Sequence, residues 1–201
     1  MSEQNAETSK ATSLEEADSV EITSLVDNSV DVTSTIEREE VQQVRRWIEE
    51  RREAEWVKKR FQLPLAEHGY SALVRLSCDG ESRSVLFDCG GSQDCIISNV
   101  QRMGFDLSGI EGIVLSHGHY DHCGGLTSVL RTIKKKDFPI IIHEDMFKIR
   151  GTANPDGTIR RYPRFPTENM IKPARYVRTK EPHLMADNTV LVTGEIPRIT
   201  F

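Results

Sequence analysis

Three histidines and an aspartate lie close together in the segment LSHGHYDHCGG, which runs from Leu115 to Gly125. Neutral imidazole is the commonest transition-metal ligand, and carboxylate joins it at zinc, iron or manganese. His117 and His119 are two positions apart, so in an extended or loop conformation both rings can face one ion. Asp121 and His122 can then face a neighbouring position. The pattern predicts a site at which two ions clamp a water or hydroxide between them.

A predicted strand and a predicted helix flank this cluster and must position it. The apolar stretch GIEGIVLSH, residues 109–117, predicts a strand that ends in the cluster. A helix is expected after Gly124 and Gly125, where apolar residues recur at helical spacing: Leu126, Val129, Leu130 and Ile133. Gly118 keeps bulk away between two histidines, and the glycine pair lets the chain turn sharply. The end of a strand is the usual active-site edge of an open α/β sheet.

The elements upstream and downstream indicate the fold class. Residues 70–91 predict a hairpin, with Asp79 and Gly80 in its turn and Asp88 at the end of its second strand. A helix is expected over residues 92–105, with Gly104 at its C-terminal cap. Residues 138–144 predict another strand, followed by a short helix and, after residue 188, one more strand. Alternating strands and helices over about residues 69–143 favour an α/β fold. Residues 151–188 give no clear assignment.

The N-terminal region differs in composition. We expect a disordered polar tail over residues 1–18, followed by one domain over residues 19–201. Its first strand is predicted between Val20 and Val30. A charged helix is expected at about residues 34–61, capped by Ser34 or Thr35, with its apolar side formed by Ile36, Val41, Val44 and Ile48. The opposite, charged face is expected to be solvated.

Composition excludes several classes of function. The 201 residues are 37% hydrophobic and 28% charged, as in a soluble globular domain. The net charge of −5 gives no general signal for nucleic acid, and RTIKKK at residues 131–136 is expected to be a solvated helix end. No apolar run approaches the roughly 18 residues that a membrane span needs. Without a secretory signal or a CxxC pair, we expect reduced cysteines and a cytoplasmic location.

Several stretches together resemble a known family. LSHGHYDHCGG looks like the metal-binding signature of the metallo-β-lactamase fold superfamily, and VLFDCG resembles the strand that precedes it there. LVDN, LAEHGYSALV and TGEIPR narrow the resemblance to one branch. That branch groups with the 7,8-dihydropterin-6-methyl-4-(β-D-ribofuranosyl)aminobenzene 5′-phosphate synthase-like proteins. The resemblance extends from about Val20 to Phe201.

The resemblance implies a four-layer αβ/βα sandwich with two divalent metal ions at one edge. His117 and His119 would ligate the first ion. Asp121 and His122 would belong to the second, with Asp121 also beside the nucleophilic water as the catalytic group. Asp88 would support the metal loop from behind the ligands. Zinc is the commonest metal in the superfamily, although iron and manganese occur. Most members are hydrolases and the branch is associated with pterin condensation, so the resemblance implies a small-molecule substrate.

The sequence also departs from the family. Members continue beyond TGEIPR and supply further histidine ligands there, whereas this sequence ends at Phe201. We therefore expect the N-terminal half of the sandwich plus part of the second, with one sheet face uncovered. His143 is expected to be a hydrogen-bonded structural histidine, and His183 to lie in an exposed loop. His68, in AEHG, is also expected to be structural.

Two classes of function stay open at this point. The first is a metal-dependent enzyme, a hydrolase or a pterin-condensing synthase, in which Glu195 and Arg198 of TGEIPR are candidate substrate residues. A structural turn with a surface ion pair explains these two residues equally well. The second is a truncated, catalytically inactive chain that serves as a metal-binding or protein-interaction module. A homodimer that completes the sandwich is a further expectation.

Overall fold

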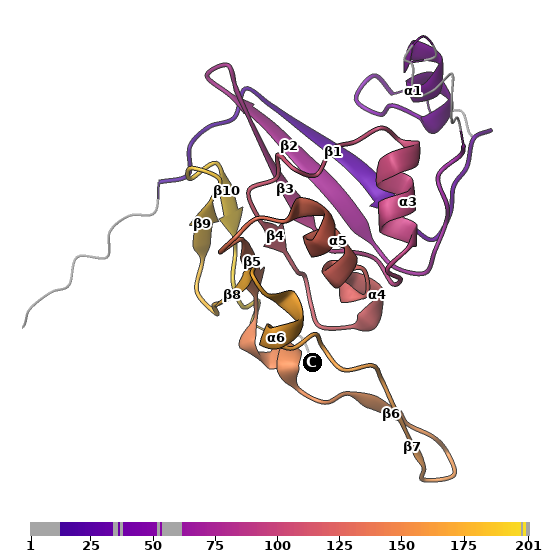
Figure 1. Cartoon of the computed structure of the whole chain (residues 1–201), viewed down its shortest axis with the longest axis vertical. Helices are drawn as coiled ribbons and strands as arrows, with labels where there is room; N and C mark the ends of the chain where they lie inside the picture. Colours follow the sequence, from indigo (N-terminus) through magenta and orange to yellow (C-terminus); the bar gives the residue numbers. More distant parts are fainter. Residues whose placement is uncertain are drawn as a thin grey trace, which may run out of the picture.

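The centre of the molecule is a mixed six-stranded sheet. The computed structural model describes residues 13–33, 36, 38–51, 53, 62–197 and 199. The sheet has the order β1-β2-β3-β4-β5-β8 (Figure 1). Its strands are β1 (Ser19–Val26), β2 (Ser71–Cys78), β3 (Glu81–Phe87), β4 (Ile113–Val114), β5 (Pro139–Ile142) and β8 (Arg175–Arg178). Neighbours from β1 to β3 are antiparallel, and those from β3 to β8 are parallel. The predicted α/β class is confirmed.

The predicted hairpin is the pair β2–β3. Leu73 pairs with Leu86 in its register, and the turn places Asp79 at φ 50° and Gly80 at φ 80°. Both residues therefore adopt the left-handed conformation that a tight two-residue turn requires. The hairpin delivers the chain to Asp88, directly beyond β3.

Helices cover one face of the sheet. Helices α3 (Cys95–Arg102) and α5 (Leu126–Ile133) lie side by side on this face (Figure 1). Their buried side chains join those of the strands in the larger core cluster, which includes Leu73, Leu86, Ile96, Val100, Ile113, Leu126, Val129 and Ile140. Burying each such side chain contributes about 1.5–3 kcal/mol. The predicted helices over residues 92–105 and after Gly125 are confirmed.

A small hairpin covers part of the opposite face. Strands β9 (His183–Met185) and β10 (Val190–Val192) pair with each other, and Met185 packs with Val85, Val114 and Ile141 of the main sheet. The expectation of an uncovered face is thus wrong where this hairpin lies. On β1, Ile22 stays 66% exposed.

The charged helix begins later than predicted. Helix α1 covers Val44–Arg51, while Ile36 and Val41 lie outside it and are exposed. Ser34, Thr35 and most of residues 52–61 lie outside the described residues. Helix α1 has no buried residue, and its main anchor is Trp47, whose ring centre is 6.0 Å from that of Phe105. Short helices depend on packing for stability. The charged residues that precede Val44 therefore do not extend this helix toward its predicted start.

The remaining elements are short. They are α4 (Tyr120–Cys123), the 3-10 turn η1 (Glu144–Phe147), β6 (Gly151–Ala153), β7 (Ile159–Arg161) and α6 (Glu168–Ile171). Elements of three or four residues carry no readable periodicity, which is why residues 151–188 could not be assigned from sequence. At the N-terminus, residues 1–12 of the predicted tail lie outside the described residues, whereas the Glu15 N–H donates to Asn188 O at 2.9 Å. Among the described residues, no helix has the length and apolar character needed to cross a membrane.

Candidate metal centre

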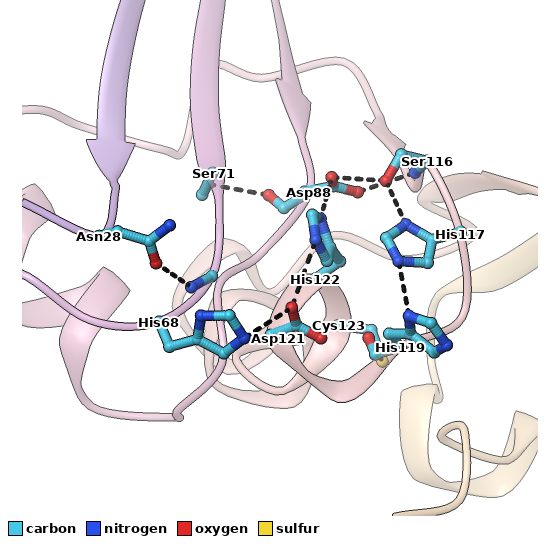
Figure 2. A network of polar contacts seen from close by, with 11 residues as sticks. Asn28, His68, Ser71, Asp88, Ser116, His117, His119, Asp121, His122 and Cys123 are labelled. Atoms are coloured by element: carbon cyan, nitrogen blue, oxygen red, sulfur yellow. Dashed lines mark hydrogen bonds and ion pairs between the residues drawn. The ribbon is translucent and has the colours of Figure 1, made fainter. Parts of the chain in front are cut away.

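The histidine cluster occupies the loop after β4 and the short helix α4. His117 and His119 lie in the loop, and Asp121 and His122 lie in the helical turn (Figure 2). His117 Nε2 is 3.0 Å from His119 Nδ1, and Asp121 Oδ2 is 3.5 Å from His122 Nε2. The structure therefore brings all four sequence-predicted ligands together, as two pairs of donor atoms.

The spacing within each pair suits a shared ion. With metal–nitrogen bonds of about 2.0–2.1 Å, two ligands of a tetrahedral zinc ion lie roughly 3.3 Å apart. At right angles, as in octahedral coordination, the same bonds place them about 3.0 Å apart. Within the described part of the chain, no group of three histidine, cysteine, aspartate or glutamate side chains is arranged to hold an ion. Among the described residues, the cluster thus presents its donor atoms in two pairs and not as a set of three.

Asp88 fixes the orientation of His122. Its side chain is completely buried, and its backbone has φ 57°, a conformation that costs a non-glycine residue energy. The carboxylate accepts hydrogen bonds from Ser116 N at 2.8 Å, Ser116 Oγ at 2.7 Å and His122 Nδ1 at 2.7 Å. A carboxylate only accepts, so His122 carries its proton on Nδ1. The lone pair of Nε2 then faces the side of Asp121, as a metal ligand requires.

Ser116 extends the same control to His117. Its single hydroxyl proton goes to Asp88, so Ser116 Oγ must accept the hydrogen bond from His117 Nδ1 at 2.9 Å. His117 is therefore also protonated on Nδ1 and presents a bare Nε2 toward His119. Asp88 thus sets the tautomers of two imidazoles at once. Sequence reasoning missed Ser116, because its role depends on a contact with Asp88 that only the folded chain creates.

His68 lies at the same centre. Its Nε2 is 3.4 Å from Asp121 Oδ2, while its side chain is 73% exposed (Figure 2). The expectation of a structural histidine missed this contact. An imidazole that is mostly in solvent adds little to the core, so the contact with Asp121 is its main interaction.

The loop that carries His68 is fastened on both sides. The Glu67 carboxylate accepts hydrogen bonds from the N–H groups of Gly91 and Ser92, each at 2.9 Å. The Tyr70 N–H donates to Asp121 O at 3.2 Å. At Gly69, with φ 146°, a Cβ would come within 2.4 Å of that same oxygen. Only glycine allows this close approach, which holds the loop against the metal-binding segment.

Gly124 lies in a turn and also serves close packing. Its φ of −60° is available to any residue. A Cβ there would, however, lie 1.9 Å from the carbonyl oxygen of Gly91. Besides the turn expected from the sequence, Gly124 therefore permits contact between two backbone segments beside Asp88.

Burial favours the neutral forms of His117 and of the Cys123 thiol. Burial, and then the neighbouring His122 and His119, lowers the pKa of His117, which favours the neutral form that binds metal. Burial also raises the pKa of the Cys123 thiol to about 12, with a smaller contribution from Asp88. All four cysteines are free, and Cys78 is the one that is not buried.

The remaining predicted residues lie elsewhere or outside the description. Glu195 is paired with His143, whose Nε2 is 3.3 Å from Glu195 Oε2, and with Lys180 at 3.8 Å. His143 also accepts a hydrogen bond from Asp145 N through Nδ1, which fits its expected structural role. His183 belongs to strand β9 and is half-buried, so the expected exposed loop is wrong. Arg198 lies outside the described residues.

A family profile matches most of this region. Residues 65–199 match the Metallo-beta-lactamase superfamily, and this segment contains the whole cluster together with Asp88 and His68. The match covers more than half of the chain, which therefore belongs to the metallo-β-lactamase superfamily. The family and the fold expected from the sequence are confirmed.

Individual relatives agree with the narrower resemblance. The chain is 32% identical over 91 residues to a 7,8-dihydropterin-6-methyl-4-(beta-D-ribofuranosyl)-aminobenzene-5'-phosphate synthase of Methanocaldococcus jannaschii, which covers 45% of this chain and 31% of the relative. It is 33% identical over 139 residues to an uncharacterized protein of the same organism, with 66% and 48% covered. The chain thus spans less than half the length of the curated relatives it matches.

Solved structures of the superfamily are also similar. The Rm3 metallo-beta-lactamase aligns with 23% identity and a TM-score of 0.36, covering 60% of this chain and 43% of that one. A quorum-quenching N-acyl homoserine lactone lactonase aligns with 18% identity and a TM-score of 0.32, covering 55% and 45%.

Proposed function

We propose that this chain carries the metal-binding centre of a metal-dependent enzyme, a hydrolase or a pterin-condensing synthase. The centre holds two divalent ions, most readily zinc, with iron and manganese as alternatives. His117 and His119 hold one ion, and Asp121 and His122 hold the other. The substrate is a small molecule, and a homodimer is the expected way for a second copy to add donors.

One observation carries the proposal. The Asp88 carboxylate is buried and directs the Nε2 atoms of both His117 and His122 away from itself, through the chain of hydrogen bonds with Ser116. Burying a carboxylate is costly unless its partners are well placed. Two imidazoles held in a single tautomer, beside a carboxylate on Asp121, support a site built for ions rather than a core satisfied by chance.

Each residue has a separate task in the chemistry. Bound divalent ions acidify a water molecule and polarise a substrate oxygen. The Asp121 carboxylate, with Oδ2 within 3.4–3.5 Å of both His68 Nε2 and His122 Nε2, is held between two imidazoles. It would orient such a water by accepting a hydrogen bond from it. Asp121 is only 16% exposed, so bulk water has restricted access to its carboxylate. The protein thereby supplies orientation and partial exclusion of solvent.

Metal content tests the proposal directly. The purified chain is loaded with zinc, desalted and measured by elemental analysis, beside a His117→Ala/His119→Ala variant. Close to two ions per chain, falling to one or fewer in the variant, is the expected result. Hydrolysis of ester and phosphodiester substrates and turnover of pterin substrates are then compared between the two proteins. Equal metal content in both proteins would overturn the assignment.

The alternative is a catalytically inactive metal-binding or protein-interaction module. The observation that favours it is the donor set, since among the described residues each ion meets two donors rather than three. Catalytic zinc sites use three protein ligands and one open position. Stoichiometric metal binding without turnover of any of these substrates would favour this second function.

A further inference from the structure

Beside the metal centre, the β6–β7 hairpin extends from the body of the protein as an arm (Figure 1). Its register pairs Gly151 with Arg161, Thr152 with Arg160 and Ala153 with Ile159, and every residue of both strands is exposed. Two short strands with no buried side chain contribute little to the core. Packing in the core therefore does not explain the sequence of this arm.

One face of the arm is directed to the metal centre. Thr152 and Arg160 are register partners, and Tyr162 is two residues beyond Arg160, so all three lie on the same face. The Tyr162 hydroxyl is hydrogen-bonded to Thr152 Oγ1, and the Arg160 Cζ is 5.6 Å from the Tyr162 ring centre. The Tyr162 ring meets His119 edge to face, with the ring centres 5.9 Å apart.

The base of the arm is fixed to the same region. The Tyr162 N–H donates to Arg150 O at 2.9 Å. Arg150 in turn donates to the carbonyl oxygens of Asp145 and Met146 in η1, at 2.7 and 2.9 Å. The strand ends are thus tied to the body, and the position of Tyr162 beside His119 is built into the fold.

The arm is basic, and most of its cationic side chains form no ion pair with another described residue. Residues 148–164 contain five cationic side chains and one aspartate, in a chain whose net charge is −5. Lys148 forms an ion pair with Asp145, and Arg150 donates hydrogen bonds to backbone carbonyl oxygens. Within the described ranges, Arg160, Arg161 and Arg164 form no ion pair, whereas Arg83 on β3 contacts three carboxylates.

We propose that Thr152, Arg160 and Tyr162 form a subsite that binds an oxyanion, a phosphate or carboxylate group of the substrate, beside the His117–His119 pair. The inference deepens the proposed function and rests on it for the role of His119 as a metal ligand. A guanidinium offers a fork of donors that matches an oxyanion. One hydroxyl proton is used in the hydrogen bond between Thr152 and Tyr162, so this pair adds one further donor at the same face. The substrate is then held by its anionic group on the arm while its reacting oxygen faces the metal centre.

Arg161, in the same strand, is a matched control for Arg160. Arg161 is adjacent to Arg160 and equally exposed, but side chains alternate along a strand, so it lies on the opposite face. Arg160→Gln and Arg161→Gln therefore remove the same charge from the same arm. A long-range electrostatic effect weakens binding equally in both variants, whereas a subsite depends on Arg160 alone.

Binding is measured by amide chemical-shift perturbation of the full chain, with phenyl phosphate and benzoate as probes, in the metal-free and zinc-loaded forms. We expect one probe or both to shift the Tyr162 amide. We expect Arg160→Gln to raise the Kd of that probe at least tenfold, Tyr162→Phe severalfold, and Arg161→Gln less than twofold. The probe that depends more strongly on Arg160 identifies the anion as phosphate or carboxylate.

Other results overturn the subsite. Equal weakening by the two arginine variants shows a diffuse positive field, and no shift at Tyr162 with either probe shows that the face binds no oxyanion. Tighter binding of a short single-stranded oligonucleotide that needs both arginines shows a nucleic-acid surface instead. Because the metal-free form is tested as well, loss of metal binding refutes the proposed function without affecting the result for the arm.

Discussion

The buried carboxylate of Asp88 accepts a hydrogen bond from His122 Nδ1 at 2.7 Å. This contact joins the end of the β2–β3 hairpin to helix α4, two segments separated by 34 residues along the chain. It also selects which nitrogen of His122 is free. The same oxygen receives the Ser116 hydroxyl, so the tertiary fold and the protonation of two histidines depend on one side chain.

Replacing Asp88 with Asn is expected to weaken both the fold and the metal centre. Asp88 Oδ2 accepts from both Ser116 Oγ and His122 Nδ1, while Oδ1 accepts from Ser116 N. An amide replaces one of these oxygens with an NH2 group that cannot accept, so the donors at that position lose their acceptor. A buried donor then lacks its partner, which costs about 1–3 kcal/mol of unfolding free energy. Loss of such support also lowers metal affinity about 10–100-fold. Urea unfolding and competition with a chromophoric chelator measure the two effects.

Asp94→Asn is the matched control for that change. Asp94 is exposed at the start of α3, and its side chain makes no capping hydrogen bond. We expect its stability and metal affinity to stay within the error of the unmodified chain. If Asp88→Asn behaves in the same way as the control, the carboxylate does not organise the site.

Ser116→Ala is expected to release the tautomer of His117 without disturbing His122. The variant removes the hydroxyl that accepts from His117 Nδ1, while Asp88 still accepts from His122. The imidazole nitrogen shifts of His117 then report a mixture of the two tautomers, whereas those of His122 stay unchanged. Affinity for zinc is expected to fall about tenfold. Ser128→Ala, in which an exposed hydroxyl of α5 is lost, is expected to change neither.

The raised pKa of Cys123, about 12, predicts a loss of stability in alkaline solution. Between pH 9 and 12 the unfolded chain releases the thiol proton while the native state keeps it, so the free energy of unfolding falls as pH rises. The slope is about 1.4 kcal/mol per pH unit for one such thiol. Urea unfolding from pH 8 to 10.5 is expected to give a shallower slope for Cys123→Ser, by that amount. Parallel slopes would show that the thiol ionises normally in the native state.

The sequence identified much of the fold and of the site because both have local signals. Gly80 marks a turn, and the apolar residues of α5 recur at helical spacing. Both are local signals, and tertiary contacts do not change the elements that they predict. The cluster from His117 to His122 is contiguous, so its spacing was visible. Ser116 and His68 could not be assigned, because their roles depend on distances to Asp88 and Asp121 that only the folded chain creates. The arm was missed because its strands have three residues each.

His68 contacts Asp121 from an anchored loop, while most of its side chain remains in solvent. Its contact with Asp121 Oδ2 makes it a positioning residue for the second pair of donors. In His68→Ala, the Asp121 carboxylate loses one of its two imidazole neighbours, so we expect the affinity for the second ion to fall severalfold while that for the first is retained. Stepwise titration with Co²⁺, followed by its visible absorption, separates the two ions.

His183→Ala, in β9, is the control and is expected to leave both steps unchanged. Because His68 is largely exposed, its removal is expected to change the free energy of unfolding by no more than about 0.5 kcal/mol. A larger loss of stability with both metal-binding steps intact would give His68 the structural role first expected from the sequence.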